Sequence, residues 1–204
     1  MKKIWKILLA VVLVMLIAAG SCVALAAAEP EEGVFAGMMG EESIDLTKLL
    51  NGLLSGNIRL PYPALNRTLQ ESLVEAGMDT ELTGLCMAPS EAAGKIWVRA
   101  WVDYDGRTWT TTMLLRMEIQ SEGNSVTALA FDPEKITVGK LPVPEMLWPV
   151  IMEQMAEQTD LPYGENGTIL YSLPEMDLGF LRLTDIRAEQ DGFVLQFGIA
   201  NPLG

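Results

Sequence analysis

The chain has 204 residues, half of them hydrophobic, and carries 14 basic against 27 acidic side chains, a formal net charge of −13. This length suits one domain with a sizeable core. The excess of acid argues against binding of nucleic acid, or of an anionic membrane surface through the body of the chain, by counterion release. The sequence contains no histidine, which excludes Ser-His and Cys-His nucleophilic pairs, imidazole zinc sites and histidine pH switches.

The N-terminus predicts a segment that enters a membrane. Three lysines within the first six residues precede an apolar run that reaches Ala28, with a mild interruption at residues 20–22. A basic start, an apolar stretch and the small-x-small tripeptide at 24–26 are typical of a secretory signal peptide. Residues 7–28 are also long enough for a retained membrane anchor. Because lysines precede the run and acidic residues follow it, either case predicts an extracytoplasmic domain, in the cell membrane or secreted.

The two cysteines add a third option for this segment. Cys22 follows Ala-Gly-Ser, which fits lipid attachment at a lipoprotein cysteine, although the usual branched apolar residue three positions earlier is missing. Cys86 lies among apolar neighbours and is expected to behave as a small buried hydrophobic residue. A processed chain without Cys22 has no second cysteine, so no internal disulfide is expected.

A domain over residues 43–204 is predicted to follow an acidic stalk. Residues 29–42 contain five glutamates and no basic residue, a composition typical of a flexible segment. A helix is then expected to start with Ser43 as its cap and to end near Gly56. Its stripe at helical spacing consists of Leu46, Leu49, Leu50, Leu53 and Leu54. A second helix is expected to open after Pro63 and to end at Gly77.

The middle of the chain changes to the period of a β-strand. Residues 95–103 alternate between an apolar face and a face that mixes tryptophan with charge. Asp105-Gly106 predicts a tight hairpin, and the return strand continues over residues 109–119. After a turn, a third strand is predicted over 125–131. Asp132-Pro133 is expected to break it, and extended structure is expected to resume over 135–138.

The last third of the chain predicts a helix and more strands. Residues 141–144 are expected to be extended, since a proline disfavours the helical conformation in the residue before it. A helix over 145–158 is expected to turn toward the sheet its apolar residues Met146, Leu147, Val150 and Ile151. Strands are predicted over 168–173, 178–186 and 192–200. The sequence thus predicts an α+β fold: an antiparallel sheet of long curved strands packed against two or three helices, after an N-terminal membrane or signal segment.

Residues 136–144 read ITVGKLPVP, and a predicted helix, Leu161-Pro162 and strands that end DGFVLQFGI follow. In this order of features the chain resembles the YpmS-like family of Gram-positive envelope proteins, whose Gly-x-Leu-Pro-x-Pro step matches at Gly139, Leu141, Pro142 and Pro144. The resemblance implies one N-terminal membrane segment and an extracytoplasmic domain of unknown function, and it supplies no catalytic residues. By fold analogy alone, such long curved strands against helices are similar to extracytoplasmic lipid-binding domains.

The polar motifs give little support to an enzyme. Residues 103–106, Asp-Tyr-Asp-Gly, resemble the start of a calcium loop, but Leu114 occupies the position of the closing glutamate, so a hairpin turn is the better interpretation. Carboxylate pairs such as Glu153 and Glu157 are expected by chance among 27 acidic residues. We therefore expect a non-enzymatic protein without catalytic residues, metal or cofactor.

Methionine and tryptophan form the more informative set. Methionine is flexible and suits adaptable apolar surfaces; the set consists of Trp97, Trp101, Met113, Met117, Met146, Trp148, Met152 and Met155. Either these residues fill an ordinary core, or a sheet covered on one face only uses them to hold a lipid or another apolar or amphipathic ligand. An alternative hypothesis, a protein-interaction or scaffold module of the cell envelope, uses Trp97 and Trp101 as a docking surface. A continuous apolar groove would favour the ligand, and a filled core with exposed tryptophans would favour a protein partner.

Overall fold

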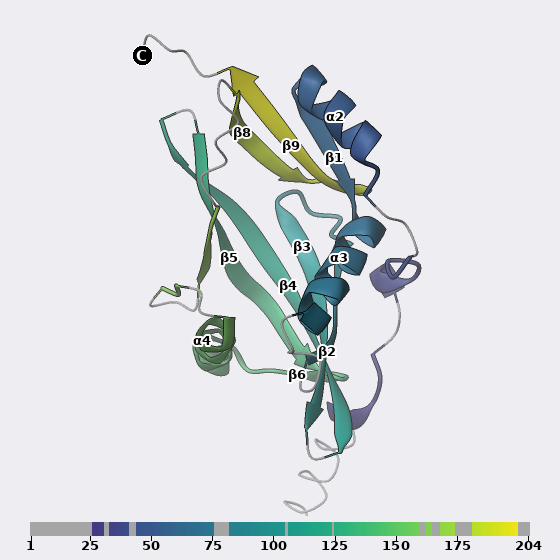
Figure 1. Ribbon diagram of the computed structural model, residues 1–204. Helices are drawn as coiled ribbons and strands as arrows, with labels where there is room; N and C mark the ends of the chain where they lie inside the picture. Colours follow the sequence, from purple (N-terminus) through teal and green to yellow (C-terminus); the bar gives the residue numbers. More distant parts are fainter. Residues whose placement is uncertain are drawn as a thin grey trace, which may run out of the picture.

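The protein combines two antiparallel sheets with helices, which confirms the α+β class (Figure 1). The computed structural model describes residues 26–30, 33–40, 44–75, 82–104, 106–123, 125–159, 162–164, 168–173 and 181–199. Where the sequence predicted one sheet, these residues form two. No helix in the described ranges is long and apolar enough to cross a membrane. Residues 1–25 of the predicted signal or anchor segment lie outside the described ranges.

The larger sheet has the order β2-β3-β4-β5-β6, with β7 paired to β5; its strands are β2 (Leu82–Pro89), β3 (Lys95–Tyr104), β4 (Arg107–Glu122), β5 (Ser125–Val138), β6 (Leu141–Pro142) and β7 (Ile169–Ser172). The smaller sheet has the order β1-β9-β8, with β1 (Asn57–Pro61), β8 (Leu181–Ala188) and β9 (Gly192–Ile199). The helices are α2 (Leu46–Ser55), α3 (Tyr62–Glu75) and α4 (Trp148–Thr159), with 3-10 turns η1 (Gly33–Phe35) and η2 (Glu145–Leu147).

Helix α2 differs from its prediction at its start and in its exposed face. Its cap is Asp45 rather than Ser43: the Asp45 carboxylate accepts hydrogen bonds from the amides of Thr47 and Lys48, at 2.9 and 3.4 Å. The helix ends at Gly56 as predicted, in the left-handed conformation that glycine adopts at low cost. Among the leucines of the stripe whose side chains the structure describes, Leu50 and Leu54 are exposed.

Two strands, β1 and β2, were not predicted. The five residues of β1 follow α2 directly and pair with β9, which is far away in the sequence. Strand β2 pairs with β3 along its length and forms an edge of the larger sheet. Helix α3, which lies between them, begins one residue before Pro63, so the proline occupies the first turn, where its missing amide hydrogen costs nothing. The predicted end at Gly77 lies outside the described residues.

The long meander β3-β4-β5 is confirmed, but its third strand does not stop where the sequence predicted. Strand β5 continues through Asp132-Pro133 to Val138. Pro133 lies opposite Leu115 and Lys135 lies opposite Leu114, so Glu134 is an extra residue in the ladder. A β-bulge of this kind accommodates proline, because an amide is locally free of the regular pairing.

Helix α4 presents to the sheet a face that matches the predicted one only at Ile151. Met146, Leu147 and Val150 are exposed, whereas Ile151 and Met152 pack on the core together with Trp148. A 3-10 turn, η2, precedes the α-helix and changes the angular position of the residues that follow. The indole of Trp148 donates a hydrogen bond to the carbonyl of Val143 at 2.9 Å, which holds this side of the helix inward.

Candidate apolar binding site

One face of the meander forms the floor of the candidate site. Buried residues from three neighbouring strands stand in cross-strand pairs on this face, as with Val98 opposite Met113 and Met113 opposite Ile136. Helix α4 covers this floor from one side with Ile151 and Met152. The β8-β9 hairpin covers it from the other side. Two buried clusters meet here, because Phe131, Ala188 and Phe193 pack against both.

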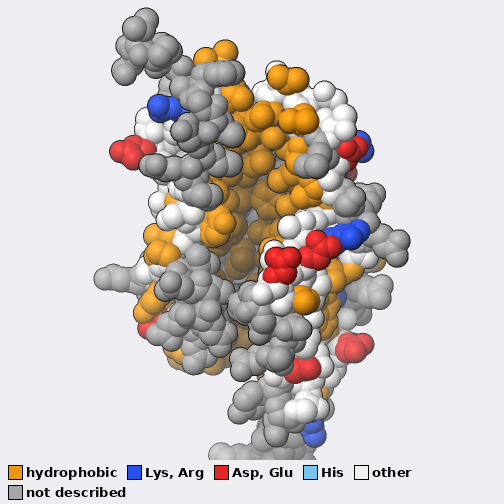
Figure 2. All heavy atoms as spheres, viewed as in Figure 1, with side chains coloured by type: hydrophobic (Ala, Val, Ile, Leu, Met, Phe, Trp, Pro, Cys, Tyr) orange, Lys and Arg blue, Asp and Glu red, His pale blue; other side chains and the backbone are white. Residues whose placement is uncertain are grey.

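Around this floor, many apolar side chains are only partly buried. The partly buried residues packed against the two clusters are Leu85, Met87, Ile119, Phe131, Val143, Trp148, Ile151, Leu173, Ala188, Phe193, Leu195 and Phe197. Figure 2 shows hydrophobic side chains gathered along a hollow in the middle of this face of the molecule. We call this hollow the apolar groove. Between its β-sheet floor and its two walls, α4 and the smaller sheet, apolar side chains remain partly exposed.

The structure brings only part of the predicted methionine and tryptophan set together. Met113 and Met152 are fully buried and share one cluster with the half-buried Trp148. Met117 is buried in the neighbouring cluster. These residues form or support the floor of the groove. Met146 is 81% exposed and belongs to neither cluster, and the side chain of Met155 lies outside the described residues.

Trp97 and Trp101 lie on the opposite face of the sheet. They pack against a third cluster formed by Phe35, Cys86 and Ala88. Strand alternation explains the separation, because residues of odd number in β3 point away from Val98 and its neighbours. The two tryptophans therefore do not line the groove.

Residues 33–40, part of the predicted flexible stalk, lie against this opposite face beside α3 and β2 (Figure 1). Phe35 is buried, and the guanidinium carbon of Arg99 lies 4.1 Å from the centre of its ring. Arg99 is itself buried and donates a hydrogen bond to Thr112 at 3.3 Å. The side-chain amide of Asn66 donates to the carbonyl of Met38 at 2.9 Å. The one sequence signal for this contact was an aromatic residue inside an acidic, glycine-containing segment.

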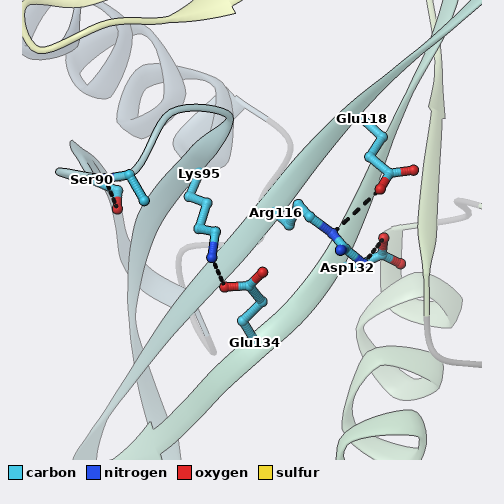
Figure 3. Close-up of polar contacts among 7 residues, drawn as sticks. Ser90, Lys95, Arg116, Glu118, Asp132 and Glu134 are labelled. Atoms are coloured by element: carbon cyan, nitrogen blue, oxygen red, sulfur yellow. Dashed lines mark hydrogen bonds and ion pairs between the residues drawn. The ribbon is translucent and has the colours of Figure 1, made fainter.

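On the face of the larger sheet opposite the groove, charged residues of neighbouring strands form ion pairs (Figure 3). Lys95 of β3 reaches over β4 to Glu134, the extra residue of the β5 bulge. Arg116 of β4 contacts Glu118 and Asp132, each at 3.4 Å. The acidic residues around the predicted strand break therefore have cationic partners and a structural role.

Two buried titratable groups have raised pKa values. Burial raises the pKa of the Cys86 thiol to about 11, with a smaller opposing effect of the Arg99 charge. Burial also raises the pKa of Tyr62 to about 12. The Tyr62 ring packs edge-on against Phe193, with centroids 5.6 Å apart. Cys86 is fully buried, as predicted, and neither group has the depressed pKa of a nucleophile.

We expect the raised pKa of Cys86 to make stability depend on pH. The folded-state pKa lies above the ordinary value of 9.0, so this contribution is fully present below pH 9 and is lost as the pH rises to about 11. Urea unfolding at pH 8 and at pH 11 should therefore differ more in the native chain than in Cys86→Ala, by about 2 kcal/mol. An identical pH dependence in both chains would contradict the assignment.

No metal centre is evident in the part of the chain that the structure describes: it contains no group of three or more histidine, cysteine, aspartate or glutamate residues that could hold an ion. Strands β3 and β4 meet at the predicted hairpin, with Tyr104 opposite Arg107 and Gly106 at a φ of +70°.

Comparison of the chain with protein-family models, curated proteins and solved structures finds no match.

Proposed function

We propose that this chain is a non-enzymatic extracytoplasmic protein of the cell envelope that binds a lipid or another apolar or amphipathic ligand in the apolar groove. The observation that carries the proposal is the set of partly exposed apolar residues, contributed by α4, the meander and the β8-β9 hairpin, that packs on two joined core clusters. An acyl chain bound in a hollow lined in this way would be shielded from water on several sides. The basic and apolar N-terminus supports a location at the membrane or outside it.

The proposed membership of the YpmS-like family is consistent with this function. The Gly-x-Leu-Pro-x-Pro step on which the resemblance depends forms β6 and the extended entry to η2 and α4. In β6, Pro142 lies opposite Thr137 and Leu141 lies opposite Val138. The step thus joins the floor of the groove to the helix that forms one of its walls.

The alternative, an interaction or scaffold module that docks through Trp97 and Trp101, has less support. Both indoles are partly buried, and the segment 33–40 already packs beside them through Phe35 and Met38. The larger set of partly buried apolar residues lies on the other face of the meander, at the groove.

A matched pair of substitutions on α4 tests the lipid proposal. Ile151 packs against the cluster at the groove, whereas its neighbour Val150 is 52% exposed. We expect full-length protein purified from membranes in mild detergent to carry lipid detectable by native mass spectrometry. Ile151→Glu should lose most of this lipid, because a carboxylate beside an acyl chain is desolvated without a partner.

Val150→Glu is the control and should retain the lipid, because it places the same charge on the solvent side of the same helix. Circular dichroism should show an unchanged secondary structure in both variants. Native protein that is consistently free of lipid, or equal retention by the two variants, would contradict the proposed function.

A further inference from the structure

The hydroxyl group of Tyr62 is buried and has no hydrogen-bond partner among the residues that the structure describes. Tyr62 is the first residue of α3 and is only 1% exposed. A buried hydroxyl without a partner is costly, so native proteins nearly always supply one from the chain, from water or from a ligand. Three other side-chain atoms in the described ranges share this property, but they belong to the partly buried residues Gln70, Trp109 and Ser125.

Tyr62 lies on the side of the smaller sheet that faces the groove. Leu60, two residues earlier in the chain, stands opposite Phe193 in the β1-β9 pair, so these two side chains share one face of that sheet. Phe193 packs against both buried clusters at the groove, and its ring meets the Tyr62 ring at 63° with centroids 5.6 Å apart. Figure 1 shows α3 beginning beside the start of β9. Tyr62 therefore lies directly behind Phe193, which is itself only partly buried.

The surroundings of the hydroxyl favour an uncharged acceptor. Burial raises the pKa of Tyr62 to about 12, so the phenol keeps its proton at neutral pH and can donate a hydrogen bond. The amide of Tyr62 donates to the carbonyl of Asp191 at 3.3 Å, which places the β8-β9 turn beside it. In this turn, Glu189 and Asp191 share the single cation Arg59. A ligand carboxylate would meet this excess of negative charge and would lose its hydration, whereas an ester carbonyl would not carry either cost.

We propose that Tyr62 is the polar anchor of the apolar groove and donates a hydrogen bond to the carbonyl oxygen of an ester-linked acyl chain. The partly buried Phe193 turns aside to admit the carbonyl, and the acyl chain lies along the floor of the groove. A single well-placed polar group in an apolar pocket fixes the orientation of the ligand. The inference rests on the proposed function and adds the class of ligand: an acyl ester rather than a hydrocarbon or a free fatty acid.

The experiment uses Tyr62→Phe, which removes the hydroxyl and keeps the ring. The full chain in mild detergent is titrated with methyl palmitate and with hexadecane, and binding is followed by native mass spectrometry. We expect the variant to bind methyl palmitate about three- to tenfold more weakly than the native chain, the equivalent of one hydrogen bond, and to bind hexadecane equally well. Tyr171→Phe is the control, because Tyr171 is 43% exposed on β7, and it should bind both probes as the native chain does. Equal affinity of native chain and Tyr62→Phe for methyl palmitate would overturn the proposal.

Two further measurements distinguish this hydrogen bond from a structural role of Tyr62. The isotope-labelled carbonyl of bound methyl palmitate should absorb infrared light at a lower wavenumber in the native chain than in Tyr62→Phe, and an identical absorption would overturn the proposal. Without a ligand, the urea midpoint of Tyr62→Phe should equal or exceed that of the native chain, because the substitution removes an unpaired buried group. A lower midpoint would show that the hydroxyl has its partner inside the chain and would likewise overturn the proposal.

Palmitic acid, as a third probe, distinguishes the ester from the free acid. If Tyr62→Phe weakened binding of palmitic acid but not of methyl palmitate, the acceptor would be a carboxylate and the proposed class of ligand would be overturned. If the native chain bound none of the three probes, the proposed function would fail, and the anchor with it. If all three bound and Tyr62→Phe changed nothing, the anchor alone would be rejected and the groove function would remain.

Discussion

Gly192→Ala is expected to lower the free energy of unfolding by about 3 to 5 kcal/mol. Gly192 has a φ of +154° and lies opposite Pro61 where β9 begins. A Cβ there would overlap the carbonyl oxygen of Leu60 and lie 2.8 Å from the Cα of Pro61. These are backbone atoms of the paired strand, so relief requires β1 and β9 to separate. Urea unfolding followed by tryptophan fluorescence measures the loss.

Gly123→Ala is the matched control for this change. Gly123 has a φ of +61° in the β4-β5 turn, but an added Cβ would meet nothing within 4 Å. The control should therefore cost only the conformational strain, about 1 kcal/mol. Equal losses in the two variants would show that the close contact with β1 has no energetic importance. Because β9 forms a wall of the groove, Gly192→Ala should also reduce the amount of copurified lipid.

Asn66→Ala is expected to destabilise the protein by about 2 to 4 kcal/mol, since it leaves several buried polar groups without partners. Asn66 is fully buried on α3. Its side-chain oxygen accepts from the amide of Met87 at 2.7 Å, and its nitrogen donates to the carbonyl of Met87 at 2.8 Å. The side chain thus pairs with edge strand β2 as a neighbouring peptide group would. Urea unfolding again gives the magnitude.

Asn51→Ala provides the comparison, because Asn51 is exposed on α2 and its loss should change stability by no more than about 0.5 kcal/mol. Asn66 also holds the carbonyl of Met38, so hydrogen exchange in residues 33–40 should accelerate in Asn66→Ala and not in Asn51→Ala. Unchanged exchange in this segment would show that Phe35 and Arg99 hold it without help from Asn66.

Local patterns in the sequence were sufficient for most of the secondary structure. Alternation over 95–103 and the Asp105-Gly106 turn predicted the β3-β4 hairpin, and Gly56 predicted the end of α2. These signals are reliable because they depend on neighbouring residues: the pleat sets the period of a strand, and glycine adopts positive φ at low cost. The strand break at Asp132-Pro133 was wrong because a bulge, which depends on the partner strand, absorbs the proline.

The candidate site depended on contacts that no local pattern contains. The sequence grouped methionines and tryptophans by type, and the structure divided them between two faces of a sheet and the solvent. The pairing of β1 with β9 and the contact of Asn66 with Met87 join distant parts of the chain. Composition and periodicity by themselves thus determined the acidic character, the α+β class and the meander. Only the tertiary structure decided which apolar residues fill the core, which line the groove and which remain exposed on α2, because burial depends on what other segments pack against each face.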